Sequence, residues 1–414
     1  MRRYLSLLGS RPFATLWGGA TVSAFGDSMT WVALVWLAFE RGGPGSVSAL
    51  VVAATAPVIV GGLALGVVLD RFDRRAVLIC VNATLACAVG LVPLWAHLAG
   101  PPPTWLLLSV AALYGFLKIA NWAGVPAMIP ALVPAEALNT ANAMESMSFG
   151  VADVAGPAVA GALIAGVGAE TVLAFDTLTY LVFLVCLVGL RGRIPQEHVG
   201  PDAHGDAGLR PALRFLWRTP PILATTLMFM AFNVGEGMLL VLLPSYTSSV
   251  LEGDAATYGL LLSAFSVGAL TGSLVVGAID WRPSLGRSIA VAQTLAGATF
   301  LVLALEVGLP GTVAVLLAAG LLISPLTIWA QTIRMRLVPE GMRGRVFGVL
   351  RTFMQATPPL GGAAAGILLG GPGVAATVVA MTAIMAVPGV VGLVTPALAE
   401  SRLRPSVPAP AHPR

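Results

Sequence analysis

Long runs of apolar residues, separated by short polar segments, make up most of the chain. A helix needs about 20 apolar residues to cross the hydrocarbon core of a bilayer, and twelve runs are long enough to do so. The runs are continuous rather than alternating, which predicts helices and not barrel strands. A helix also satisfies its own backbone hydrogen bonds, as lipid surroundings require. The expected spans are 13–39, 47–69, 76–98, 104–129, 138–166, 171–190, 221–250, 256–279, 288–308, 312–337, 344–369 and 374–397.

The composition agrees with a membrane protein and excludes several other classes. Of the 414 residues, 57% are hydrophobic and 10% are charged, whereas soluble domains carry about 25% charged residues. This excludes a cytosolic enzyme, a secreted disulfide scaffold, a disordered chain and a nucleic-acid-binding protein. The formal net charge is only +4, and the basic residues lie between the spans, where they orient the protein in the membrane rather than form a surface for nucleic acid.

The placement of arginine predicts the orientation of the chain. Arginines gather at both termini and in the even-numbered connections, whereas Arg41 is the only one in an odd-numbered connection. Because basic connections stay in the cytoplasm, we expect both termini there, in a multi-pass protein of the cell (inner) membrane. The start of the chain lacks a short apolar core followed by a small-residue cleavage site, so we expect the first run to be retained as a helix.

The polar segments divide the chain into four parts. Residues 191–219 form the longest polar stretch and are rich in proline, glycine and charge. We expect a cytoplasmic linker here, in which 209–218 could form a short interfacial helix. The parts are a six-helix bundle at 1–190, the linker at 191–219, a second six-helix bundle at 220–399 and a disordered cytoplasmic tail at 400–414.

The two bundles repeat one another in sequence. Short similar segments recur in the same order in both halves, and each half holds six spans, so the halves are parallel repeats related by an axis along the membrane normal. The fold class is therefore an all-α membrane protein of 12 transmembrane helices in two pseudo-symmetric six-helix bundles. Such bundles rock around a site near the midplane. The matching segments are 25–29 with 234–238, 132–134 with 337–339, and 156–163 with 361–368.

One loop carries a resemblance to a known family. The segment Gly66-x-x-x-Asp70-Arg71-x-Asp73-Arg74-Arg75 follows the second span. It resembles the loop motif G-x-x-x-D-R-x-G-R-R of the major facilitator superfamily, with Asp73 in place of the usual glycine. The resemblance implies a conformational latch, in which the glycine permits close helix approach and the aspartate faces the positive end of a neighbouring helix; the alternative is a generic basic loop. The expected latch residues are Gly66, Asp70, Arg71, Arg74 and Arg75.

The fifth span carries a second resemblance. Gly150, Gly156, Pro157 and Gly161 resemble the antiporter motif G-x-x-x-G-P-x-x-G-G of exporter branches, with alanines replacing two glycines. The resemblance implies export, while ordinary tight helix packing is the alternative. Segments 126–143 and 343–348 are similar to the branch that contains macrolide-type efflux pumps and the enterobactin exporter.

Ionisable residues within the spans are costly and are functional candidates. Asp27 and Glu236 lie at equivalent repeat positions in the first and seventh spans, where each could bind and release a proton. Lys118 is the only lysine, and we expect it to pair with Asp27, Glu145 or Asp153. The proton-coupling candidates are therefore Asp27, Glu236, Asp153 and Glu145. Asp176 lies near the outer end of its span and is expected to reach water.

Several other residues are expected to line the substrate cavity. The family resemblance implies that the first, fourth, seventh and tenth spans surround it, and polar and aromatic side chains occur there at suitable depth. Trp31 lies one turn from Asp27 and could face an aromatic or cationic molecule. The complete expected set is Trp31, Asn121, Trp122, Asn233, Trp329 and Gln331.

Other chemistry is missing from the sequence. There is no phosphate-binding loop for ATP, no hydrolase motif, and no cysteine or histidine spacing for a metal, so we expect neither enzymatic activity nor a cofactor nor a metal site. The protein is expected to be a proton-coupled exporter (antiporter) of small amphipathic molecules such as drugs, acting as a monomer in the lipid bilayer. Alternatives are a narrow-specificity siderophore or metabolite exporter, a lipid flippase, or a membrane sensor or scaffold that transports nothing.

Overall fold

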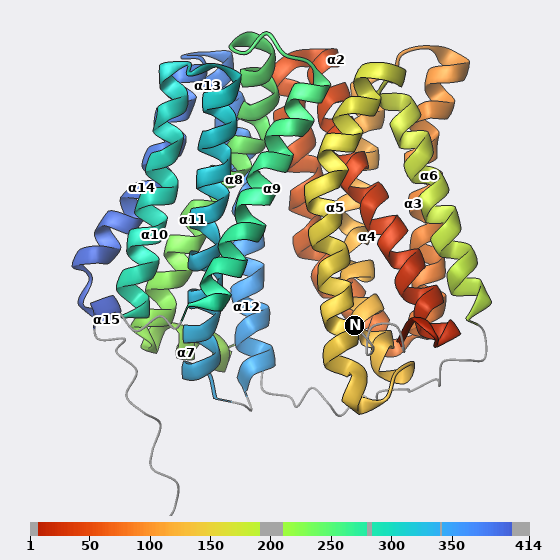
Figure 1. The fold of residues 1–414 in the computed structure, drawn as a ribbon, viewed down its shortest axis with the longest axis horizontal. Helices are drawn as coiled ribbons and strands as arrows, with labels where there is room; N and C mark the ends of the chain where they lie inside the picture. The colour runs from red at the N-terminus through yellow and green to blue at the C-terminus, as the bar shows by residue number, and fades with distance from the viewer. Residues whose placement is uncertain (1–6, 191–209, 280–283, 340–341, 400–414) are drawn as a thin grey trace, which may run out of the picture.

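The computed structural model describes residues 7–190, 210–279, 284–339 and 342–399. Within these ranges the chain is helical and has no strand. The helices form two bundles that lie side by side, one from the first half of the chain and one from the second (Figure 1).

The N-terminal bundle contains five named helices that make six passages. Its long first helix breaks at Gly42 and Gly43, where the backbone leaves helical geometry and Gly43 takes a positive φ of 60°, just before Pro44. The break separates the first two expected spans. The helices are α2 (Arg11–Arg71), α3 (Arg74–Ala99), α4 (Thr104–Met128), α5 (Leu138–Val167) and α6 (Ala169–Gly189), with 3-10 turns at Ile129–Ala131 and Ala135–Ala137.

The C-terminal bundle shows the opposite feature, because one expected span is divided. α12 ends at Gln355 and α13 begins at Pro358, which lacks a backbone N–H and so suits the start of a new helix. The members are α8 (Pro220–Ser249), α9 (Ala255–Ala278), α10 (Leu285–Thr299) with a 3-10 turn at Phe300–Leu305, α11 (Gly308–Leu337), α12 (Arg343–Gln355), α13 (Pro358–Gly370), α14 (Val374–Val394) and α15 (Pro396–Ala399).

The predicted number of spans is confirmed for the described residues. By length and composition, 10 helices are able to cross a membrane. That number treats α2 as one helix although it turns back at Gly42–Gly43, and it omits α12 and α13, which are too short singly but follow one another as a single passage. Together these helices make twelve passages.

The closest described contacts between the two halves lie near one end of the helices. This is the end opposite the arginine-rich connections. Gly161 of α5 lies against α9, where a Cβ would be 2.4 Å from the Ala255 carbonyl oxygen. Ser48 Oγ of α2 donates to the Gly362 carbonyl of α13 at 2.8 Å. Toward the opposite end, where α7 and α12 lie, the ribbons of the two bundles diverge (Figure 1).

The short helix expected at 209–218 is present as α7 (Arg210–Arg218). Ala212 and Leu216 bury one face against Ile222, Val338 and Val346, while the arginines of α7 are exposed. Residues 191–209 of the expected linker, and the expected tail at 400–414, lie outside the described residues.

Candidate functional site

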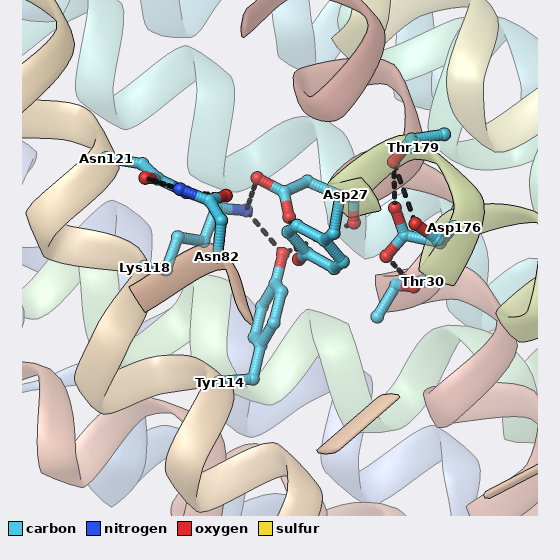
Figure 2. Close-up of polar contacts among 9 residues, drawn as sticks. Asp27, Thr30, Asn82, Tyr114, Lys118, Asn121, Asp176 and Thr179 are labelled. Carbon is cyan, nitrogen blue, oxygen red and sulfur yellow. Dashed lines mark hydrogen bonds and ion pairs between the residues drawn. The ribbon is translucent and has the colours of Figure 1, made fainter. Parts of the chain in front are cut away.

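Asp27 lies at the centre of a polar network inside the N-terminal bundle (Figure 2). The residue is only 7% exposed. Asp27 Oδ1 accepts a hydrogen bond from Tyr180 Oη of α6, and Oδ2 lies 3.9 Å from Lys118 Nζ of α4. Of the three acids considered as partners of Lys118, the structure therefore brings Asp27 to it.

Lys118 is held by aromatic residues of its own helix. Its ammonium donates to Tyr114 Oη at 2.6 Å, and that hydroxyl donates in turn to the Asp27 carbonyl at 3.3 Å. The ammonium also lies 5.1 Å from the centre of the Trp122 ring, within the range of a cation–π interaction. The pairing of Lys118 with Asp27 is therefore one part of a larger network that includes two rings.

Asp176 belongs to the same helix contact, and the expectation that it reaches water is wrong. It is 1% exposed. Thr30 Oγ1 of α2 donates to Asp176 Oδ2 at 2.5 Å, and Thr179 Oγ1 donates to Oδ1 at 2.7 Å. A Cβ at Gly26 would lie 1.9 Å from Asp176 Oδ1, so the absent side chain allows α6 to approach α2 this closely. Thr179 lies three residues beyond Asp176 on the same helix, and this local contact does not by itself reveal which face of α6 is buried.

An amide pair fixes the neighbouring part of α4. Asn82 Nδ2 of α3 donates to Asn121 Oδ1 at 2.9 Å, and Asn121 Nδ2 donates back to Asn82 Oδ1 at 3.1 Å (Figure 2). Asn82 is fully buried and Asn121 is nearly so. Each amide thus satisfies the other, which holds Asn121 in one orientation at the wall of an adjoining cavity.

The cavity lies within the N-terminal bundle and includes Asp27 in its wall. It has an empty volume of about 550 Å³, part of it open to solvent, and its walls come from α2, α4, α5, α6 and the turn after α4. Of the expected cavity residues, Asn121 and Trp122 lie here, and so does Glu145. The apolar wall consists of Phe13, Leu16, Ala20, Ala24, Val125, Ile129, Phe149 and Phe183.

Three polar atoms of this wall have no hydrogen-bond partner in the described structure, namely Trp17 Nε1, Ser23 Oγ and Glu145 Oε1. By contrast, Thr21 Oγ1 donates to Ser148 Oγ at 2.9 Å across the contact of α2 with α5. Buried polar groups are rarely left unpaired in folded proteins. Three such atoms at one cavity therefore indicate a place for a polar ligand or ordered water.

The other proton-coupling candidates lie elsewhere. Glu236 of α8 is half-buried, and within the described ranges no hydrogen bond or ion pair involves its side chain. Asp153 of α5 is exposed and is not part of the cavity wall. The structure thus brings Asp27 and Glu145 to one cavity but leaves Glu236 in the opposite bundle.

The remaining expected cavity residues do not line the described cavity. Asn233 Nδ2 donates to the Met354 carbonyl at 3.0 Å and thereby ties α8 to α12. Trp329 is buried in the core of the C-terminal half, Gln331 is exposed, and Trp31 packs partly buried against the core. Asn233 and Trp329 therefore pack within the C-terminal bundle, and Trp31 packs beside the core from α2.

In this conformation two of the three basic residues of the expected latch, Arg74 and Arg75, bind within their own bundle. Arg75 Nε and Nη2 donate to the carbonyls of Leu187 and Val188 at 2.6 and 2.9 Å, at the end of α6. Arg74 Nη1 donates to the Ala127 carbonyl at 3.2 Å, at the end of α4. Both arginines thus neutralise the negative ends of helices.

The other latch residues make no described contact between the halves. A Cβ at Gly66 would meet nothing within 4 Å, so the close helix approach expected there is not formed in this conformation. Arg71 is exposed. The side chain of Asp70 lies outside the described part of the structure.

The expected antiporter motif of α5 serves two different contacts. A Cβ at Gly156 would lie 2.5 Å from Ser28 Oγ of α2, within the same half, whereas Gly161 faces α9 of the other half. The Pro157 carbonyl lies close to Gly259 of α9, and Gly150 faces open space. Small residues therefore let α5 approach one helix in each half.

Arg334 is a buried cation that the sequence did not distinguish from the surface arginines. It lies one turn before the end of α11 and is only 6% exposed. Its guanidinium lies 5.4 Å from the centre of the Phe229 ring of α8. Nε and Nη2 have no hydrogen-bond partner in the described structure.

Comparison with known proteins places this architecture in a family. The MFS_3 family model, described as transmembrane secretion effector, matches residues 4–411. The chain is 27% identical over 397 residues to the multidrug efflux pump Tap of Mycolicibacterium fortuitum, covering 94% of this chain and 95% of that protein. It is 21% identical over 267 residues to macrolide efflux protein A of Streptococcus pyogenes, covering 64% and 66%.

Solved structures share the fold. A bacterial homologue of the iron transporter ferroportin in an inward-facing state superposes with a TM-score of 0.72 at 16% identity, covering 95% of this chain and 99% of that one. A bacterial homologue of the human lysosomal transporter Spinster, inward-facing and unoccupied, gives 0.68 at 13% identity, covering 95% and 98%. With the family match over nearly its whole length, the chain belongs to the transmembrane secretion effector family of the major facilitator superfamily.

Proposed function

We propose that this protein is a proton-coupled exporter of small amphipathic molecules such as drugs. The single observation that carries the proposal is the double role of Asp27, which belongs to the cavity wall and also faces the only lysine at 3.9 Å. A change in the charge of Asp27 therefore alters the cavity and the contact between α2 and α4 together. The names of the multidrug and macrolide efflux relatives support drugs as the substrate class.

The arrangement of the bundles supports alternating access. The closest contacts between the halves lie away from the arginine-rich connections, so the conformation opens toward that end. Basic connections favour the cytoplasm, which supports an orientation with both termini inside and the opening on the cytoplasmic side of the cell membrane. A substrate then enters from the cytoplasm, as export requires.

Protonation of Asp27 supplies the coupling step. Two unit charges 3.9 Å apart attract by about 4 kcal/mol at an effective dielectric constant of about 20. Protonating the carboxyl removes this attraction, although the 22% exposure of the Lys118 side chain reduces the effect. The remainder is comparable with the few kcal/mol that separate conformations of one protein. Glu236, at the equivalent repeat position, is the second proton-binding candidate.

The test is drug accumulation in proteoliposomes under an imposed pH gradient. The Asp27→Asn variant is expected to lose accumulation against the drug gradient but to keep downhill exchange, because the cavity remains while the titrating group is gone. Glu236→Gln measures the second candidate, and Glu306→Gln, at an exposed site in the connection before α11, is the matched control. If Asp27→Asn protein accumulates drug as the parent does, Asp27 is not the coupling group.

A further inference from the structure

The short helix α7 carries its arginines on one exposed face. Successive residues of a helix turn by about 100°, so Arg210, Arg214 and Arg218 follow one another along a single stripe, and all three are exposed. The opposite face holds Ala212 and Leu216, which are 1% and 2% exposed and pack against α8, α12 and the end of α11. α7 is thus fastened to the C-terminal bundle by one face and presents the other outward.

No acid balances this stripe in the part of the chain that the structure describes. The three arginines make no ion pair or side-chain hydrogen bond there. The described acids of the C-terminal half are Glu236 within α8 and three residues in the connections before α9 and α11, at the end of the bundle away from α7 (Figure 1). The end that carries α7 is therefore basic throughout its described residues.

A tryptophan borders the stripe. Trp217 lies three residues after Arg214 and seven after Arg210, which places it on the same face of the helix, and it is 69% exposed. Tryptophan is enriched at the level of lipid headgroups, where its ring contacts the acyl chains and its N–H stays among polar groups. A helix that combines arginines with an exposed tryptophan in this way suits the surface of a membrane.

The chain also confines α7 to that surface. α7 ends at Arg218 and α8 begins at Pro220, so a single residue separates the stripe from the next helix. α8 is long and apolar enough to cross a membrane, and its first residue lies at the basic end of the bundle (Figure 1). The arginines therefore lie where headgroups are close, which favours lipid over a soluble acidic partner.

We propose that α7 binds anionic phospholipid headgroups, with the phosphates on Arg210, Arg214 and Arg218 and the Trp217 ring at the boundary of the acyl chains. A guanidinium suits phosphate because its planar group donates two parallel hydrogen bonds. The arginines follow one another at about 6 Å along the helix, so the stripe can hold neighbouring headgroups. This inference goes beyond the proposed export function and shares with it only the orientation, since the cytoplasmic leaflet supplies anionic lipid.

The test is native mass spectrometry of the purified full chain in detergent, titrated with lipid. The two probes, phosphatidylglycerol and phosphatidylcholine, carry the same acyl chains and differ in net charge, and the parent is expected to bind phosphatidylglycerol more tightly. One arginine near an anionic surface strengthens binding by about fivefold, so the combined variant Arg210→Gln, Arg214→Gln and Arg218→Gln is expected to bind phosphatidylglycerol about 100-fold more weakly. Its binding of phosphatidylcholine is expected to stay unchanged, which also verifies that the variant is folded.

A matched control separates a defined surface from overall charge. Arg287→Gln, Arg336→Gln and Arg351→Gln together remove the same charge from exposed positions at the same end of the C-terminal half, but none lies on α7. This control is expected to keep most of the phosphatidylglycerol binding. Equal weakening in both combined variants would mean nonspecific attraction and would overturn the assignment of α7.

Two further outcomes would also overturn it. One is equal binding of the two lipids by the parent, and the other is full displacement of phosphatidylglycerol by inorganic phosphate, which would indicate a site for soluble anions instead. The titration uses neither a proton gradient nor a drug, so its result is independent of drug accumulation by the Asp27→Asn protein. Failure of lipid selectivity leaves the exporter proposal intact, and failure of coupled export leaves the lipid surface intact.

Discussion

The contact between α5 and α9 can be opened by a single methyl group. At Gly161 an added Cβ would lie 2.4 Å from the Ala255 carbonyl oxygen and 3.1 Å from the Cα atoms of Ala256 and Gly259. All three are backbone atoms, so no flexible side chain can move aside. Forcing an extra carbon into a packed contact costs about 1–3 kcal/mol, and a bias of that size changes the ratio of two conformations by about 5- to 150-fold. Gly161→Ala is therefore expected to shift the protein toward the conformation in which this end is open.

The measurement is the distance between the halves at that end. Spin labels on cysteines introduced at Thr171 of α6 and Leu309 of α11, in a background that lacks Cys80, Cys87 and Cys186, report it by double electron–electron resonance. Both labelled positions are exposed. Gly166→Ala is the control, because a Cβ at Gly166, on the same helix, would meet nothing within 4 Å. If Gly161→Ala and Gly166→Ala give the same distance distribution as the parent, the contact does not hold the halves together.

Three further predictions concern stability and are measured by thermal unfolding in detergent. Asp176→Leu is expected to destabilise the protein by about 1–3 kcal/mol, because the hydroxyls of Thr30 and Thr179 lose their acceptor. Asp176→Asn keeps an acceptor and is expected to cost less. Equal losses of stability in the two variants would contradict the hydrogen-bonding role. Arg75→Leu is expected to destabilise by about 1 kcal/mol or more through its lost hydrogen bonds to the end of α6, while Arg71→Leu, at an exposed site, is expected to change little. At Asp254, which precedes α9, the backbone N–H of Thr257 donates to the carboxylate at 3.0 Å and lowers its pKa. Because the pKa is lowered, the stabilisation is present above the ordinary aspartate pKa of about 3.9 and is lost as the pH falls below it. Asp254→Ala is therefore expected to cost about 1 kcal/mol of stability at neutral pH and less in acid. A loss of stability that does not depend on pH would refute this.

Much of the architecture follows from the sequence because the bilayer restricts what an apolar run can become. A continuous run of about 20 apolar residues in lipid has to be a helix, so the twelve passages were predictable. The exact breaks were less so. The break at 42–43 falls between two expected spans, but the division between α12 and α13 depends on local backbone geometry near proline rather than on hydropathy.

The candidate site was predictable in its chemistry but not in its partners. The single lysine and the acids of the spans could be recognised from cost alone, since charge within a membrane is expensive. Three acids were equally available to Lys118, and only the packing of α2 against α4 and α6 selects Asp27. The sequence placed Glu145 and Glu236 in different bundles, but only the tertiary structure shows that Glu145 shares a cavity wall with Asp27.

Asp176 and Arg334 mark the limit of sequence reasoning. Position along a helix gives the depth of a residue in the membrane, because each residue adds about 1.5 Å. Depth suggested that both side chains reach water, yet they are 1% and 6% exposed. Burial depends on which face of the helix meets a neighbour, and that is decided by contacts between distant segments, such as the approach of α6 to α2 at Gly26. The sequence alone determined the helices, their number and their depth, and the tertiary structure decided which charges face one another.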